Sequence, residues 1–229
     1  MAKYEIILFD ADGTLLDFVQ TEKVALQKTF AEHDFLLTPE IEERYGIINK
    51  QLWNDFENGL IAKEEITNQR FTRLFAEVGI NYDGRLFNDE YLNNLACGYF
   101  TIPGAKEICA ILSKHCRLYF ATNGIASTQF QRIDGSGLAS YFQATFVSEN
   151  AGEPKPSPIF FDYCFSQIPD FDRAKTLIIG DSLYSDIKGG QQAGIATCWF
   201  NPTNLEAKND IKPDYVIHDL TELENIILP

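Results

Sequence analysis

Acidic, hydroxyl and basic side chains stand where several short apolar runs of the sequence end. They are Asp10, Asp12, Thr122, Lys155 and Asp181. In an open parallel sheet, ligands bind beyond the carboxyl ends of the strands, so these side chains are predicted to converge on one pocket. Taken singly, Asp-x-Asp-Gly and Thr-Asn-Gly are typical of turns, and a lysine between prolines is typical of a solvated loop. Together, these three features and the fourth, Asp181, follow four successive strands, and their combination favours a shared phosphate site.

The first two carboxylates suit displacement at phosphorus. Phosphate monoesters are inert, so a site that cleaves them needs a nucleophile, a proton donor and charge neutralisation. Asp10 is predicted to be the nucleophile. Asp12 lies two residues on and projects to the same side of an extended chain. From there it would protonate the leaving alcohol and later activate the water that releases the phosphate.

A cluster of Asp10, Asp181 and Asp186 would need a cation. Two ionised carboxylates about 4 Å apart repel by roughly 4 kcal/mol at an effective dielectric constant of 20. Mg²⁺ is the predicted cofactor, because it prefers carboxylates, water and substrate phosphate as ligands. Lys155 would offset the remaining negative charge and bind both Asp10 and a phosphate oxygen. In the alternative interpretation, Asp186 only caps or supports the following helix.

Other phosphate oxygens are predicted to bind the Thr122 hydroxyl and backbone N–H groups at Asn123 and Gly124. No stretch supplies a Walker P-loop, which excludes nucleotide-triphosphate machinery of that type.

Alternating strands and helices are predicted to position these residues. The apolar runs that predict strands are 4–9, 117–121, 144–147, 176–179, 195–200 and 215–217. The segments that predict helices between them are 104–114, 125–135, 158–167, 184–193 and 220–227. This alternation predicts an α/β fold with a Rossmann-like parallel sheet covered on both faces.

The region from 17 to 97 breaks the alternation, because it holds amphipathic helical segments and no convincing strand. These segments are 20–33, 39–57, 63–78 and 85–96. We therefore predict a core domain of residues 1–16 and 98–229, interrupted by an all-helical cap domain of residues 17–97.

Composition limits the partners. A formal net charge of −14 disfavours nucleic-acid polymers and anionic membrane surfaces, although a small anion could still bind at a locally positive site. The five cysteines form no CxxC pair, which fits a reduced cytoplasmic setting. No apolar run reaches the roughly 18 residues of a membrane span, so we expect a soluble protein. The sequence carries no signal of oligomeric state.

The motifs described above, in their order along the chain, resemble those of the haloacid dehalogenase superfamily of phosphohydrolases. The matching residues are Asp10-Ala-Asp-Gly-Thr14, Thr122, Lys155, and Gly180-Asp181 with Asp186. The resemblance implies that Asp10, Asp181 and the Asp12 carbonyl bind Mg²⁺ directly, with Asp186 acting directly or through water. A helical insertion after the first motif is what this superfamily calls a type 1 cap.

Within the superfamily, the sequence looks most similar to YjjG-type pyrimidine 5′-nucleotidases. The stretches that carry this resemblance are 49–56, 58–59, 121–124 and 196–199. It implies that the substrate is a small phosphorylated metabolite, specifically a nucleoside monophosphate. The predicted cap contacts to that substrate are Phe18, Asn49, Lys50, Trp53 and Arg70. Trp53 and Phe56 lie three residues apart, however, a spacing that is also typical of ordinary helix packing.

Three alternatives remain at this stage. The scaffold could serve a sugar-phosphate phosphatase or phosphomutase, whereas a haloacid dehalogenase proper would not need Asp12 as acid and base. A signalling receiver module shares a phosphorylatable Asp, Mg²⁺ ligands and a Lys, but it has about half this length and no helical insertion. A binding protein that has lost activity is disfavoured because every motif residue is present.

Overall fold

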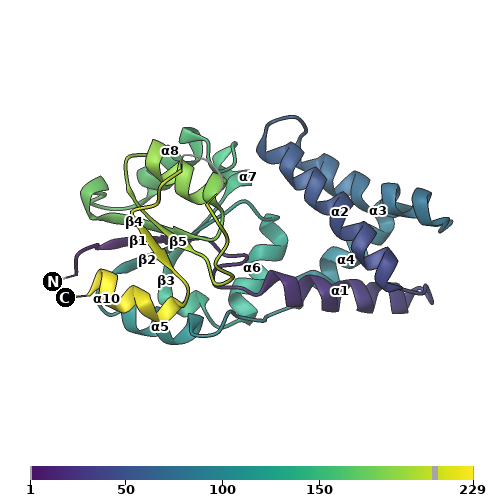
Figure 1. The fold of residues 1–229 in the computed structure, drawn as a ribbon, viewed down its shortest axis with the longest axis horizontal. Coiled ribbons are helices and arrows are strands. Elements are labelled where there is room, and N and C mark those ends of the chain that lie inside the picture. The colour runs from purple at the N-terminus through teal and green to yellow at the C-terminus, as the bar shows by residue number, and fades with distance from the viewer. Residues whose placement is uncertain (1, 208–210, 229) are drawn as a thin grey trace. The chain divides into compact units, whose positions relative to one another are not determined.

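The structure, a computed structural model, describes residues 2–207 and 211–228. It divides into two compact units. The first is the α/β core, which runs up to Val19 and resumes at Tyr99, and the second is the helical unit, Gln20–Gly98. Figure 1 shows both units, coloured along the chain.

A six-stranded sheet forms the centre of the core. Its strands are β1 (Ile6–Phe9), β2 (Arg117–Thr122), β3 (Phe142–Val147), β4 (Thr176–Gly180), β5 (Ala196–Phe200) and β6 (Tyr215–Ile217). Every neighbouring pair is parallel, in the order β3-β2-β1-β4-β5-β6. β1 therefore lies between β2 and β4, where the direction of strand succession reverses.

β1 is apolar throughout because both faces of the sheet are covered. Ile7 and Phe9 belong to one hydrophobic cluster, whereas Ile6 and Leu8 belong to another. Helices α5 (Ala105–Leu112), α6 (Ala126–Gly135) and α10 (Leu223–Ile227) contribute to the first cluster. Helix α8 (Pro158–Gln167) contributes to the second. In Figure 1, α8 accordingly lies on one side of the sheet and α5 with α10 on the other.

Four helices define the insertion. They are α1 (Phe18–Glu32), α2 (Pro39–Glu57), α3 (Lys63–Val78) and α4 (Gly84–Ala96). α2 begins as its sequence predicts, because Thr38 caps it by accepting a hydrogen bond from the Ile41 N–H and proline takes the first helical position. The unit packs around aromatic rings, and the Phe87 ring centroid lies within 5.2 Å of those of Phe30, Phe71 and Phe75.

The predicted fold class, a parallel α/β core with an all-helical insertion, is confirmed. Contacts place the ends of the insertion at 19/20 and 98/99, rather than at 16/17 and 97/98. Two contacts explain the first difference: the Asp17 N–H donates to the Phe100 carbonyl at 3.0 Å, and the Phe18 ring packs on Arg132. Among the described residues, no helix combines the length and apolarity that crossing a membrane requires.

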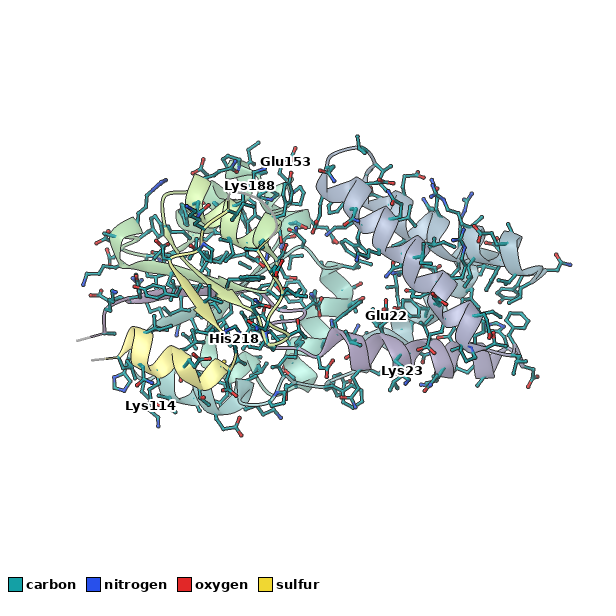
Figure 2. All side chains as sticks on the ribbon, in the orientation of Figure 1. Glu22, Lys23, Lys114, Glu153, Lys188 and His218 are labelled. Carbon is teal, nitrogen blue, oxygen red and sulfur yellow. The ribbon has the colours of Figure 1, made fainter. Side chains whose placement is uncertain are left out.

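One predicted helix, 184–193, is irregular. The chain forms a π-helical turn, η3 (Leu183–Lys188), before the short α9 (Gly189–Gln192). Lys188, labelled in Figure 2, ends this turn with its Nζ 4.4 Å from the centroid of the Tyr184 ring. Such π turns often occur at functional sites, and this one holds Asp186 fully buried. Another short helix, α7 (Ser148–Ala151), follows β3 directly, and short 3-10 turns lie at η1 (Ala139–Tyr141), η2 (Arg173–Lys175) and η4 (Leu220–Glu222).

Candidate active site

The carboxyl ends of β1, β2 and β4 bring the predicted core residues together. Asp10 directly follows β1, and its N–H donates to the Ile179 carbonyl of β4 at 2.9 Å. Because β1 has a parallel neighbour on each side, Asp10 lies beside the ends of both strands. Asp10 is only 8% exposed, so its carboxylate lies in a confined setting.

Lys155 is the centre of this arrangement. Its ammonium group donates to Asp10 Oδ1 at 2.6 Å, Asp186 Oδ1 at 2.6 Å and the Ala121 carbonyl at 2.5 Å. The side chain is 1% exposed. A lysine ammonium has three donors, and here all three have protein partners. A phosphate oxygen would therefore have to replace one of them, which the sequence did not predict.

Asp10, Asp181 and Asp186 form a cluster that fits a hard divalent cation. One carboxylate oxygen from each lies within 4.8 Å of the others. Three carboxylates match the oxygen ligands that Mg²⁺ prefers. The backbone makes room for them, because a Cβ atom at Gly13 would lie 2.6 Å from Asp181 Oδ2 and one at Gly180 would lie 2.1 Å from Asp186 Oδ2. A side chain at either position would therefore displace one of these two carboxylates.

Asp186 also has partners within the protein. Its Oδ1 accepts from Lys155, and its Oδ2 accepts from the Ser182 N–H at 3.1 Å. An ionised carboxylate has about four lone-pair sites, so these bonds leave capacity for a metal or a water. Asp181 is oriented through its main chain, since Trp199 Nε1 donates to the Asp181 carbonyl at 2.8 Å.

Burial and mutual repulsion shift the pKa values of the cluster. Burial raises the pKa of Asp10 well above its ordinary value of 3.8, against the pull of Lys155. Asp181 is the member of the cluster that solvent reaches. Even so, the surrounding protein partly desolvates its carboxylate, and this effect, together with the smaller effect of the Asp186 charge, raises the pKa of Asp181 to about 7. Burial would lower the pKa of Lys155, but the two neighbouring carboxylates outweigh burial and raise it.

These shifts predict a pH-dependent response to Mg²⁺. Without a divalent cation, the folded chain keeps a proton on Asp181 that the unfolded chain releases near 3.8, so stability should fall as pH rises toward about 7. Mg²⁺ binds the deprotonated carboxylates, and a hundredfold excess over Kd stabilises a fold by about 2.7 kcal/mol. We expect Mg²⁺ to raise the melting temperature more at about pH 8 than at about pH 6.

The measurement is a thermal melt in EDTA and in Mg²⁺ at each pH. Asp181→Asn should remove most of the increase. Asp162→Asn, which changes an exposed aspartate of the same core, should keep it. An equal increase of the melting temperature at both pH values would contradict the prediction that Mg²⁺ binds at a deprotonated Asp181.

Asp12 is held by two residues of α6 that the sequence did not indicate. Arg132 Nη1 donates to Asp12 Oδ1 at 2.5 Å, and Gln129 Nε2 donates to Asp12 Oδ2 at 2.6 Å. Both partners are 1% exposed. Their spacing of three residues on one helix was the available signal, but polar residues at this spacing are equally typical of a solvated face.

The predicted phosphate-binding residues lie together, with partners of their own. The Thr122 hydroxyl accepts from the Gly124 N–H at 3.1 Å and from Gln129 Nε2 at 2.9 Å. The Asn123 side chain pairs with the Lys155 backbone through two hydrogen bonds of 2.8 and 2.9 Å. Asn123 thus fixes the loop that carries Lys155. A hydroxyl has two acceptor sites and one donor, so these two bonds use the acceptor sites of Thr122 and leave its O–H as a donor; phosphate binding by Thr122 stays a prediction.

Four of the five predicted substrate contacts lie in the helical unit. Lys50 is exposed, and Trp53 is half-buried with its ring edge-on to Phe56 at 5.9 Å, an arrangement that is also typical of ordinary helix packing. Arg70 is 1% exposed, donates to Asn88 at 2.7 Å and lies over the Tyr91 ring.

Asn49, the fourth, donates to Glu22 at 3.0 Å; Glu22, labelled in Figure 2, projects from α1. Phe18, the fifth predicted contact, belongs to the core, where its ring lies 5.5 Å from the Arg132 guanidinium. Substrate binding by these five residues stays a prediction.

The chain is similar to known proteins in both sequence and fold. Residues 4–194 match a family described as haloacid dehalogenase-like hydrolase. YfnB of Bacillus subtilis, named as a HAD-hydrolase, is 42% identical over 99% of this chain and 97% of its own. Its magnesium-bound crystal structure superimposes with a TM-score of 0.94, at 41% identity, over 99% of this chain and all of that one.

Two further relatives have more specific names. Pyrimidine 5′-nucleotidase PynA of Streptococcus pneumoniae is 39% identical over 96% of this chain and 93% of its own. Pyrimidine 5′-nucleotidase YjjG of Escherichia coli is 34% identical over 98% of both chains.

Proposed function

The chain belongs to the haloacid dehalogenase-like hydrolase family, and from this premise we propose that it is a Mg²⁺-dependent phosphatase acting through an aspartyl-phosphate on Asp10. The observation that carries the proposal is the buried Lys155, which bridges Asp10 and Asp186 beside Asp181. A nucleophilic carboxylate, a fixed ammonium and a carboxylate cluster that fits Mg²⁺ are the groups that phosphoryl transfer requires.

In the first step, an Asp10 carboxylate oxygen bonds to phosphorus and the ester P–O bond breaks. The electron pair of that bond leaves with the ester oxygen, which takes a proton from Asp12. Lys155 keeps Asp10 oriented, and the Thr122 hydroxyl donates to a phosphate oxygen. Mg²⁺ held by Asp10, Asp181, Asp186 and the Asp12 carbonyl would supply positive charge to the phosphoryl oxygens.

In the second step, Asp12 acts in the opposite direction. Its carboxylate takes a proton from water, whose oxygen attacks phosphorus and releases the Asp10 carboxylate and inorganic phosphate. The position of Asp12 supports this role, because α6 fixes both of its oxygens while the side chain remains 28% exposed and thus within reach of water.

The proposed substrate is a nucleoside 5′-monophosphate with a pyrimidine base. The names of PynA and YjjG support this class, since both relatives match nearly the whole chain, including the helical unit. We propose that Asn49, Lys50, Trp53 and Arg70 of that unit, with Phe18 of the core, contribute to substrate selection.

A panel of phosphate esters tests the substrate. We expect kcat/KM for uridine and thymidine 5′-monophosphates to exceed that for glucose 6-phosphate by about tenfold or more. Adenosine 5′-monophosphate separates a pyrimidine preference from a general nucleotide preference. Phosphate release in Mg²⁺ and in EDTA is the readout. If hexose phosphates are the better substrates, the nucleotidase assignment fails and a sugar-phosphate phosphatase replaces it.

A further inference from the structure

Both oxygens of Asp12 are held by donors from the same helix. Arg132 and Gln129 lie three residues apart on α6, so their side chains point the same way. Each takes a different oxygen of Asp12, at 2.5 and 2.6 Å. Arg132 also donates to Gln129 Oε1 at 3.1 Å, which fixes the two donors relative to one another. The orientation of Asp12 is therefore set by α6 as well as by its own loop.

Gln129 connects Asp12 to a second site residue. The same amide nitrogen that donates to Asp12 also donates to the Thr122 hydroxyl at 2.9 Å. Thr122 and Asp12 are thereby held at a fixed spacing by one side chain. Gly124 leaves the space that Gln129 needs, because a Cβ atom there would lie 2.3 Å from Gln129 Nε2.

Arg132 is supported on its other side by an aromatic ring. The Phe18 ring lies 5.5 Å from the guanidinium, within the range of a cation–π contact. The guanidinium is 1% exposed, so water does not weaken its pairing with Asp12 as it would at the surface. Arg132 can donate to Asp12 in either protonation state, because a carboxylic acid keeps a carbonyl oxygen that accepts.

We propose that Arg132 and Gln129 are positioning residues that aim Asp12 at the leaving oxygen of the substrate. The inference rests on the proposed function, in which Asp12 is the acid and base. By holding Asp12 and Thr122 together, Gln129 sets the distance between the group that protonates the ester oxygen and the group that binds the phosphate. Arg132 holds the second oxygen of Asp12 and prevents its rotation.

Leaving-group dependence separates this role from a general structural one. A nucleoside leaves as an alkoxide that needs a proton, whereas p-nitrophenolate leaves without one. Because kcat/KM reports the steps up to the first irreversible one, it isolates transfer to Asp10 from the later hydrolysis. We expect Arg132→Met and Gln129→Met to lower kcat/KM for uridine 5′-monophosphate by about 10- to 100-fold, and for p-nitrophenyl phosphate by about threefold or less.

Four further variants complete the test. Asp12→Asn should show the same selective loss, and adding Arg132→Met to it should cause little additional loss, because the two residues act as a unit. Arg132→Lys retains the charge and should recover part of the activity lost in Arg132→Met. Arg85→Met, which changes an exposed arginine of α4, is the matched control.

Equal losses on both esters, additive losses with Asp12→Asn, or no loss would each overturn the inference. If Arg132→Met does not fold in a thermal melt, Gln129→Met and Arg132→Lys decide by the same criteria. Failure of the proposed function would look different: the unmodified chain would release no phosphate from either ester, or Asp10→Asn would stay active.

Discussion

Asp10→Asn is expected to lower kcat for phosphate release by on the order of 10⁴- to 10⁶-fold, because an amide cannot attack phosphorus. The fold should remain. Asparagine is nearly isosteric, and Lys155 keeps its bonds to Asp186 and the Ala121 carbonyl. Since burial raises the pKa of Asp10, the folded state disfavours its charge. Removing that charge should leave the melting temperature in EDTA unchanged or higher.

Initial rates and thermal melts on the same preparations measure both effects. In the unmodified protein, acid-quenched samples should carry a phosphoryl adduct by intact mass, and Asp10→Asn should carry none. Asp162→Asn, whose side chain is 72% exposed, controls for the chemical change itself. An active Asp10→Asn variant would mean that another residue is the nucleophile.

Lys155→Met is expected to destabilise the fold strongly when no divalent cation is present. Lys155 is the buried cation between Asp10 and Asp186, and removing one partner of a buried ion pair typically costs about 3–5 kcal/mol. Mg²⁺ should restore part of this loss, because it would neutralise the same carboxylates. Phosphatase activity should fall by about 10²-fold or more even with Mg²⁺, since Asp10 loses its orienting partner.

Urea unfolding in EDTA and in Mg²⁺ provides the free energies. Lys175→Met is the matched control, because Lys175 forms an exposed pair with Glu5 at 3.4 Å and its loss should change stability by about 1 kcal/mol or less. Similar free energies of unfolding for the two lysine variants would show that Lys155 does not hold the cluster together.

The fold and the core of the candidate site could be read from local patterns. Continuous apolar runs ending in polar residues identify parallel strands, and the edge at which they end then brings Asp10, Thr122 and Asp181 together. The start of α2 at Thr38-Pro39 depends only on neighbouring residues, and the structure confirms it.

Features that depend on packing could not be read in this way. Gln129 and Arg132 look like ordinary helix-surface residues, and only the fold shows that they face Asp12. The π turn at Leu183–Lys188 carries Asp186, whose buried side chain pairs with Lys155 from a distant part of the chain. Lys155 likewise shows no sign in the sequence that all three of its donors are used within the protein.

The strand order also sets a sequence of events during synthesis. β1 leaves the ribosome first, but Ile6 pairs with Arg117 on one side and with Thr176 on the other. The helical unit is one continuous stretch, Gln20–Gly98, so its contacts close over shorter chain distances. We therefore expect this unit to fold on the nascent chain while Ile6–Phe9 still lacks both neighbours. A chain stalled before β4 would expose that apolar strand to chaperones and to aggregation.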